Sequence, residues 1–278
     1  MLKEQRQLPF AAEATLVNEI QALYDSQSGF YGPEHLIYGR NLNLHISVLL
    51  GLAAANNPVP QEAIAALERR QAPDGGWSLS SGGASDIEVT ALAVQALVAV
   101  DTFRVTPVVL DKAKAFLLSQ QNQDGGFPHI KRSQCCAESN AVSTAFAVQA
   151  LIPLGTAQVD LDAISTAIGF LRSLQRDSGA FADKLSQPEE SLGATYHVVP
   201  ALLGVSFASP LSISGANPGQ PIPGMPSLGA RGENSPPFAW FFSVAAFLLI
   251  LGLVVRRAGR RPGQVRSTRY TTSPRIRH

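Results

Sequence analysis

The stretch Gln71-Ala72-Pro73-Asp74-Gly75-Gly76-Trp77 recurs along the chain and decides its fold class. The same pattern of glutamine, three residues, glycine, one residue and an aromatic residue returns at 121–127 and 175–181. A weaker copy, Tyr24 to Phe30, keeps Gly29 and Phe30 but lacks the glutamine. The aromatic residues stand at positions 30, 77, 127 and 181. One period of this length holds two helices, so the sequence predicts an array of helical hairpins.

Each repeat predicts two helices of different character. In the segment 61–70, Ile64 and Leu67 share one face and charged residues occupy the opposite face, which is typical of an amphipathic surface helix. The segment 87–100 is apolar on nearly every side and predicts a helix that is covered all round. The alternation returns at 112–119 with 141–154, and at 163–174 with 193–205. We therefore expect an outer layer of amphipathic helices, each with one solvent-exposed face, around an inner layer of buried helices.

The four inner segments begin in the same register. Their first positions carry residue types favoured at helix N-termini: Asn41, Asp86, Asn140 and Ser191. One turn later stand His45, Thr90, Thr144 and Thr195. Because every inner helix starts at the same end, the positive ends of the helix dipoles are expected to gather at one rim of the array.

These repeats resemble those of the terpene cyclase and protein prenyltransferase superfamily. Gln-x3-Gly-x-Trp is the repeat signature of squalene and hopene cyclases, and phenylalanine replaces tryptophan here in two copies. The resemblance covers residues from about 15 to 206 and implies an all-α fold of the α/α-toroid type. A complete toroid has more hairpins than the four counted here. We therefore expect an incomplete ring: an open segment, a truncated domain, or a domain that pairs with another copy.

One branch of that superfamily is similar to the last repeat. The stretch from Glu190 through Ser191, Thr195 and Tyr196 to Gly204 resembles the end of the helical domain in cobalamin-binding proteins such as transcobalamin and intrinsic factor. This resemblance implies that the domain binds a corrinoid-like ligand without catalysis. The β-domain that completes a corrinoid site in those proteins is absent, and other segments occupy its place.

The cyclase resemblance also implies an acidic motif. Those enzymes begin their reaction with an acid in an Asp-x-Asp-Asp-Thr motif at the head of an inner helix, because a neighbouring carboxylate keeps one proton acidic enough for an alkene. This chain has Asp86-Ile87-Glu88-Val89-Thr90, with valine at the fourth place. We expect Asp86 to serve as a helix cap, and Asp86 with Glu88 are the only catalytic candidates.

A zinc site of the prenyltransferase type is not predicted. Those enzymes hold zinc through Asp-x-Cys and a later histidine, whereas Cys135 and Cys136 precede the cap Asn140 and His197 is displaced from the expected register. The two adjacent cysteines, the only ones in the chain, cannot join distant segments. A strained ring or a soft-metal ligand pair is an alternative, but we expect two small, partly buried side chains.

The C-terminal part predicts a membrane tether. Residues 207–237 are rich in proline, glycine and serine and predict a flexible linker. Residues 238–255 carry no charge and are long enough for one transmembrane helix, with Trp240 as an interfacial anchor. The tail 256–278 carries eight arginines and no acid, which predicts a cytoplasmic tail and an extracytoplasmic repeat domain, 1–206. No signal peptide is recognisable near Met1, so we expect a late or truncated start.

Composition adds few constraints. The chain of 278 residues is 45% apolar with a formal charge of +1, so it gives no reason to expect a nucleic-acid partner. We expect His35 and His129 to be solvated loop residues. No cofactor and no metal are predicted, although a corrinoid is possible as a ligand.

Three functions remain open from the sequence. The leading one is a non-catalytic binding module for a hydrophobic or corrinoid-like molecule or a partner protein, seated at the rim. The second is an enzyme acting on an isoprenoid diphosphate, with Lys131 and Arg132 as the basic pair that would hold the diphosphate. The third is a structural repeat scaffold. The candidate ligand-binding residues are Asn41, His45, Asp86, Glu88, Thr90, Glu138, Asn140, Thr144, Thr195 and Tyr196.

Overall fold

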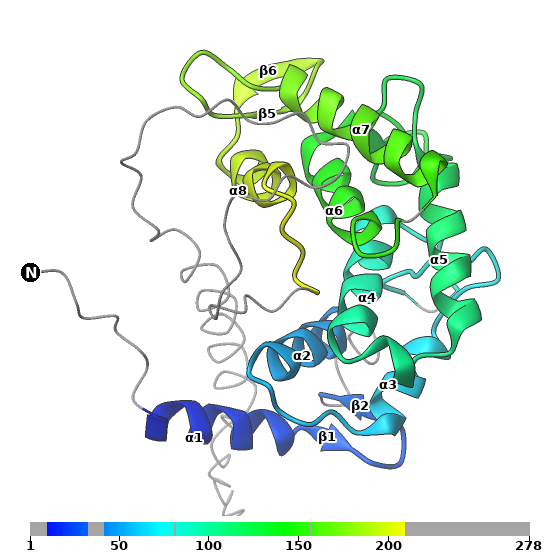
Figure 1. The fold of residues 1–278 in the computed structure, drawn as a ribbon, viewed down its shortest axis with the longest axis vertical. Helices are drawn as coiled ribbons and strands as arrows, with labels where there is room; N and C mark the ends of the chain where they lie inside the picture. The colour runs from blue at the N-terminus through cyan, green and yellow to red at the C-terminus, as the bar shows by residue number, and fades with distance from the viewer. Residues whose placement is uncertain (1–9, 33–41, 81, 156, 209–278) are drawn as a thin grey trace, which may run out of the picture. The chain divides into compact units, whose positions relative to one another are not determined.

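The computed structural model describes residues 10–32, 42–80, 82–155 and 157–208 (Figure 1). These residues form eight α-helices, one short 3-10 helix and three two-stranded antiparallel sheets. The first helix of each hairpin is α1 (Phe10–Gln21), α3 (Gln61–Glu68), α5 (Pro107–Gln120) or α7 (Gln158–Ser173). The second is α2 (Leu42–Ala54), α4 (Ile87–Ala99), α6 (Ala141–Leu151) or α8 (Leu192–Leu202). The mostly helical fold predicted from the repeats is confirmed.

The second helices pack against one another in series. α2 contacts α4, α4 contacts α6, and α6 contacts α8. Figure 1 shows α3, α5 and α7 along one side of this row, so the row forms an inner layer and α3, α5 and α7 an outer one. The two-layer arrangement agrees with the predicted alternation of amphipathic and apolar helices. Closure into a toroid stays a prediction.

Short strands line the turns between the helices of a hairpin. β1 (Tyr24–Asp25) pairs with β2 (Phe30–Tyr31), and β3 (Phe127–Pro128) pairs with β4 (Ser139–Asn140). β5 (Ala182–Lys184) pairs with β6 (Gln187–Glu190). The short helix η1 (Thr102–Arg104) connects α4 to α5. These pairings bring each aromatic residue of the repeat back to the start of its inner helix.

The repeated glutamine ties its own turn to the next outer helix. The Gln71 side-chain amide donates to the carbonyl of Gly75 at 2.9 Å and to that of Val109, in α5, at 2.8 Å. Gly75 has a φ of +90°, and a Cβ there would lie 2.5 Å from the Lys112 carbonyl oxygen of the same helix. Glycine is required both by this conformation and by the close approach. The motif is therefore a device for packing one hairpin on the next.

The aromatic residue closes the hairpin from within. Trp77 is fully buried, and its ring nitrogen donates to the Leu67 carbonyl at 2.9 Å. Its backbone N–H donates to the Thr90 hydroxyl at 2.9 Å. Phe127 donates in the same way to Thr144, and Phe181 to Thr195. The threonines predicted for the rim are thus structural acceptors.

The first copy of the repeat lies one residue later than its sequence suggests. Tyr31 takes the place of Trp77, because its backbone N–H donates to His45 Nδ1 at 3.1 Å. Gly29, with a φ of +78°, corresponds to Gly75, and Phe30 fills the position between them. The prediction that Phe30 is the repeat aromatic was wrong, since the copy lacks the glutamine that sets the register elsewhere.

The predicted helix caps are confirmed where they are described. The Asp86 side chain accepts from the Val89 N–H at 2.8 Å, and Asn140 accepts from Ser143 at 2.8 Å. Ser191 accepts from the Ala194 N–H at 3.1 Å. Asn41 lies outside the described residues.

The predicted burial of the inner helices holds for α4 and α6 but not for α8. Leu192 is 88% exposed and Leu203 49% exposed, although the sequence predicts a helix covered all round. No described element lies beyond α8 to cover this face in the way that α6 follows α4. The burial therefore depends on a neighbour rather than on the helix itself.

Most of the predicted membrane tether lies outside the described residues, which end at 208. Among the helices that are described, none combines the length and the apolar character needed to cross a bilayer.

Candidate active site

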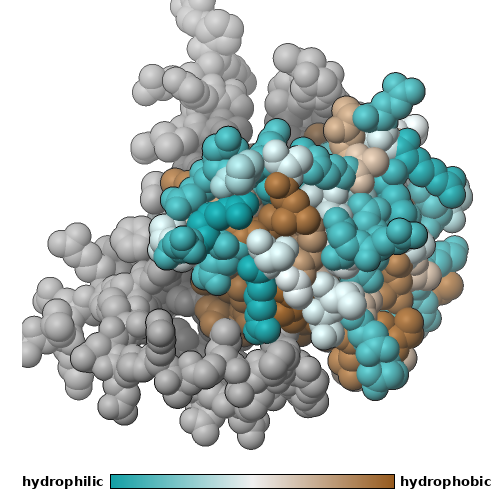
Figure 2. Space-filling view, turned by 90° about the horizontal axis from the view of Figure 1, so that it is seen from above, coloured by the Kyte–Doolittle hydropathy of each residue, from teal (hydrophilic) through white to brown (hydrophobic). Residues whose placement is uncertain are grey.

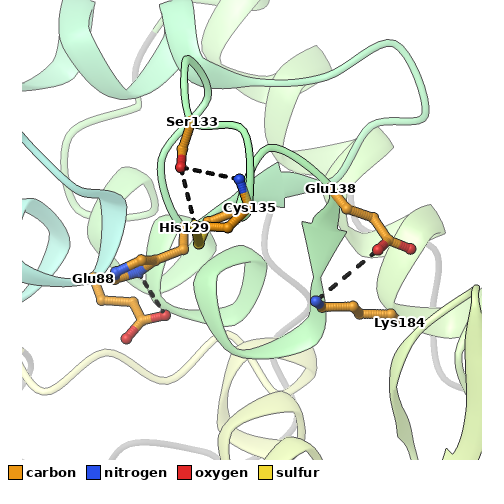
Figure 3. The surroundings of a disulfide bond; sticks show 7 residues. Glu88, His129, Ser133, Cys135, Glu138 and Lys184 are labelled. Atoms are coloured by element: carbon orange, nitrogen blue, oxygen red, sulfur yellow. Dashed lines mark hydrogen bonds and ion pairs between the residues drawn. A yellow bond between two sulfur atoms is a disulfide. The ribbon is translucent and has the colours of Figure 1, made fainter.

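A cavity of about 280 Å³ opens where the starts of α4 and α6 meet the loop after β3 and the strand β5. It is lined by Glu88, His129, Cys135, Cys136, Glu138, Asn140, Val142, Asp183 and Lys184. Three successive repeats therefore contribute to it, and the N-terminal ends of two inner helices adjoin it. Part of the lining is drawn in Figure 3.

Glu88 is the acid that the α4 start presents to this cavity. Its Oε1 accepts a hydrogen bond from the Ser143 hydroxyl at 2.8 Å and lies 3.2 Å from His129 Nδ1 (Figure 3). The contact with His129 is close enough for an ion pair but lacks the alignment of a hydrogen bond. The carboxyl is thus held between α6 and the β3 loop while staying partly open to solvent.

Asp86, two residues earlier, has a different role. It is buried and its carboxylate accepts the Val89 N–H, so it caps α4. Burial raises the pKa of Asp86 to about 6, against the opposing effects of that hydrogen bond and of His129. The predicted cap is confirmed, and Glu88 rather than Asp86 faces the cavity.

A second carboxylate reaches the cavity from β5. Burial raises the pKa of Asp183, and the negative charge of Glu88 raises it further, while Lys184 acts in the opposite direction. The sequence motif 86–90 has valine where the cyclase motif has its last aspartate. Asp183 lines the same cavity as Glu88, so the second carboxyl group here comes from β5 rather than from the motif.

The opposite lip of the cavity carries an ion pair. Lys184 Nζ lies 3.9 Å from Glu138 Oε2, and the Ser186 hydroxyl donates to the other oxygen of Glu138. Figure 3 shows this pair on the far side of the loop from Glu88. Lys184 is the one cation among the lining residues other than a protonated histidine.

His197 of α8 stands near the cavity without lining it. Its ring centroid lies 4.8 Å from that of Phe146 and 5.0 Å from that of Tyr196. Burial lowers the pKa of His197, and Glu88 acts against this shift. A neutral imidazole beside aromatic rings gives this side of the site an apolar character.

The two cysteines form a disulfide with each other at the cavity wall. The expectation of two free, partly buried side chains was wrong, and the alternative of a ring closed by a bond between the two neighbours is what the structure shows. The Ser133 hydroxyl lies 3.1 Å from Cys135 Sγ and so supports the loop (Figure 3). Sequence could not decide between these states, because adjacency permits both.

The structure gathers only some of the predicted ligand-binding residues. Glu88, Glu138 and Asn140 line one cavity, and Asp86 adjoins them. His45 is buried elsewhere, and its Nε2 lies 2.9 Å from the Ala63 carbonyl oxygen. The threonines Thr90, Thr144 and Thr195 are occupied by backbone hydrogen bonds, and Tyr196 lies partly exposed on α8.

Several lining residues were missed or misassigned. His129 was predicted to be a solvated loop residue, but it contacts Glu88 at 3.2 Å. Under the enzymatic alternative, Lys131 and Arg132 were the pair expected to hold a diphosphate, but the Lys131 ammonium donates to the Ser119 and Gln121 carbonyls at 2.9 and 2.7 Å. It therefore stabilises the C-terminal end of α5. Lys184 and Asp183 had no signal in the sequence beyond lying shortly after the fourth repeat aromatic, Phe181.

Within the ranges that the structure describes, no three histidine, cysteine or carboxylate side chains are placed to hold a metal ion. The thiols closest to the cavity are consumed in the disulfide.

Comparisons with known proteins agree with the repeat fold. A model of the squalene-hopene cyclase C-terminal domain matches residues 31–190, which is more than half of the chain. Drimenyl diphosphate synthase from Streptantibioticus cattleyicolor is 30% identical over 169 residues, and that from Streptomyces showdoensis is 31% identical over 163 residues. The matched part is 60% and 56% of this chain, but 28% of each relative.

Solved structures of similar fold include ent-copalyl diphosphate synthase from Streptomyces platensis, with a TM-score of 0.46 and 17% identity. The match covers 66% of this chain and 36% of that one. Protein geranylgeranyltransferase-I of Candida albicans gives a TM-score of 0.49 at 17% identity, with 65% and 52% of the two chains covered.

Proposed function

Since this chain belongs to the squalene-hopene cyclase C-terminal domain family, we propose that it acts on an isoprenoid substrate at the cavity beside α4, with Glu88 as the proton donor. The observation that carries the proposal is the placement of the Glu88 carboxyl between His129 and Ser143 in a cavity shared with Asp183. The relatives named drimenyl diphosphate synthase support an isoprenoid diphosphate as the substrate class.

The proposed step is an acid-initiated cyclisation. The protonated Glu88 carboxyl gives its proton to one carbon of a terminal alkene, so that a C–H bond forms and a carbocation develops at the neighbouring carbon. A second alkene of the same substrate attacks that cation and forms the ring bond. The cyclised cation then loses a proton to water, and the Glu88 carboxylate takes up a proton from solvent, so the net reaction is an isomerisation that needs no oxidant or reductant.

Each neighbour of Glu88 has a part in this chemistry. Burial, with the negative charge of Glu88 beside it, raises the pKa of Asp183, so Asp183 is the second carboxyl group of the cavity and the one that holds its proton more strongly than an ordinary aspartate. The Ser143 hydroxyl fixes the orientation of Glu88. Phe146 and His197 pack against each other near the cavity and give this side of the site an apolar character.

A binding module without turnover is the second candidate. The cavity is small, and the last acid of the cyclase motif is replaced by Val89. A ligand bound at this cavity would contact the same lining residues, but its binding would need no proton on Glu88. The resemblance of 190–204 to cobalamin-binding proteins is the support for a corrinoid.

We also propose that residues 238–255 anchor the protein in a membrane, with 207–237 as the linker and the arginine-rich tail 256–278 in the cytoplasm. The uncharged segment beside a tail of eight arginines supports this topology. Protease treatment of intact and opened cells tests it. The proposal predicts that the repeat domain is cleaved in intact cells and the tail only in opened ones. Cleavage of the tail in intact cells would contradict the assignment.

The enzymatic proposal is tested with the full chain and linear prenyl diphosphates of increasing length. We expect a cyclic product from the wild type and a loss of about 100-fold or more in rate for Glu88→Gln, because the amide has no acidic proton. Asp111→Asn on the exposed face of α5 is the matched control and should keep the wild-type rate. Binding without any product in the wild type would favour the binding module.

A further inference from the structure

The last repeat carries the same motif as the middle repeats, but among the residues that the structure describes no further hairpin packs on it. Gln121 of the third repeat donates to the Gly125 carbonyl of its own turn and to the Ala163 carbonyl of α7, both at 2.8 Å. Among the described residues, Gln175 donates only to its own turn, to the Gly179 carbonyl at 3.3 Å. Within the described ranges, no following outer helix supplies the second acceptor.

The glycine of the same turn shows the same difference. A Cβ on Gly125 would lie 2.6 Å from the Thr166 carbonyl oxygen of α7. Gly179 has the same left-handed conformation, with a φ of +91°, but no described atom lies within 4 Å of such a Cβ. An open groove of about 510 Å³ lies at this turn, lined by residues 175–178 and 188–190. The groove occupies the position at which the earlier turns receive an outer helix.

The inner helix of the last repeat has a matching apolar stripe, which we call the α8 stripe. It consists of Leu192, Tyr196, Val199 and Leu203, with exposed fractions of 88%, 44%, 41% and 49%. The residues in the same register on α6 are Ala141, Ala145, Val148 and Ile152, and the first three are fully buried. On α4, Ala91 and Val94 of the same register are fully buried as well. An apolar stripe along one whole helix marks a contact surface.

The opposite end of the row offers a hairpin of the required kind. α1 precedes α2 at the start of the described row, and no described element packs extensively against α1. On α1, Thr15, Asn18 and Glu19 are exposed. One face of α1 is therefore accessible. The corresponding outer helices α5 and α7 are each covered by the turn of the preceding repeat.

We propose that two copies of this chain associate through these ends, so that the α7–α8 hairpin of each copy receives the α1–α2 hairpin of the other. The interface continues the hairpin-to-hairpin packing already made by α4 with α6 and by α6 with α8. A two-fold axis satisfies both ends of both copies at once, which closes the assembly. α8 carries no Asp, Glu, Lys or Arg, so no like charges oppose the contact.

Figure 2 shows hydrophobic surface between hydrophilic side chains on the side of the molecule where α7, β5 and β6 lie in Figure 1. This mixture of an apolar centre and a polar border is typical of protein interfaces. The proposal does not depend on the chemistry assigned to Glu88.

The test uses the purified full chain in detergent and measures its mass by analytical ultracentrifugation at roughly micromolar concentration. We expect twice the chain mass of 29.5 kDa for the wild type. Val199→Glu should shift the equilibrium to the single-chain mass, with a dissociation constant raised about 100-fold or more. Phe103→Glu is the matched control, because Phe103 is 97% exposed on η1, away from the stripe, and should leave the dimer intact.

A second measurement locates the interface. Ser178→Cys and Thr15→Cys chains, purified separately and then mixed under oxidising conditions, should form a disulfide-linked dimer, whereas Phe103→Cys with Thr15→Cys should not. A wild type that stays at the single-chain mass would overturn the proposal. The proposal would also be overturned if residues 238–255 of the same chain were found to cover α8.

Discussion

The middle and last repeats share a motif and differ in surroundings. In the second repeat, Gln71 and Gly75 pack on α5 and Trp77 is fully buried. In the fourth, Phe181 is also buried, but Gln175 and Gly179 face no following helix in the part of the chain that the structure describes. The motif therefore sets the turn by itself, whereas its contribution to packing depends on the next hairpin.

The largest expected difference concerns the glycines. Gly75→Ala combines a left-handed backbone with a clash against the Lys112 carbonyl, so we expect a loss of roughly 3 kcal/mol in the free energy of unfolding. In the single chain, at protein concentrations too low for association, Gly179→Ala introduces only the backbone strain and should cost about 1 kcal/mol. Urea titration of both variants measures the difference. Equal losses would show that the turn alone governs the stability.

A second contrast concerns the pH dependence of stability at two helix N-caps, Asp86 of α4 and Ser191 of α8. Because burial raises the pKa of Asp86 to about 6 from 3.8, its contribution to stability is complete below pH 4 and is lost as the pH rises through about 6. Asp86→Asn keeps the acceptor for Val89 but removes the charge. Between pH 4 and pH 8, we expect the free energy of unfolding of the variant to rise by roughly 2 kcal/mol relative to that of the wild type. Urea titrations at each pH measure this difference. Ser191, the cap of α8, does not titrate, so Ser191→Asn should give no such pH dependence.

The smallest contrast concerns the glutamines. Gln71→Ala removes two hydrogen bonds to backbone carbonyls and should cost about 1–2 kcal/mol. Gln175→Ala removes one long bond at an exposed site and should cost less than about 0.5 kcal/mol in the monomer. Thermal melts of the two variants decide this. A Gln175→Ala loss as large as that of Gln71→Ala, seen only at high protein concentration, would support the association of two copies.

The sequence predicted what local physics controls. The hairpins, the caps at Asp86, Asn140 and Ser191, and the buried Trp77 follow from periodicity and residue type within one repeat. The slip between Phe30 and Tyr31 arose where the repeat had lost its glutamine. The exposure of α8 escaped prediction because burial of an apolar helix requires a neighbour that pattern alone does not supply.

The site was predicted less completely than the fold. Glu88 was found because it belongs to a contiguous motif on α4. Its partners His129, Ser143 and Asp183 come from the next two repeats and meet it only when the hairpins stack. Nothing in the sequence around these three residues marks them as a group. The threonines that recur in a regular register were predicted to bind a ligand, but their hydroxyls accept backbone hydrogen bonds.

The family match shifts the balance between the functions left open by the sequence. A non-catalytic module was the leading expectation, yet the family and the named relatives favour an isoprenoid-acting enzyme. The chain spans 28% of the length of those relatives, so their complete activity is a proposal for this protein.

Solvent isotope incorporation tests the role of Glu88 most directly. A carboxyl that exchanges its proton with solvent transfers deuterium to the alkene carbon when the reaction runs in D₂O. The account predicts that the wild-type full chain, given a prenyl diphosphate that it turns over, releases a cyclic product with a single deuterium on that carbon, and that Glu88→Gln releases none. A cyclic product without deuterium, or the same labelled product from Glu88→Gln, would contradict it.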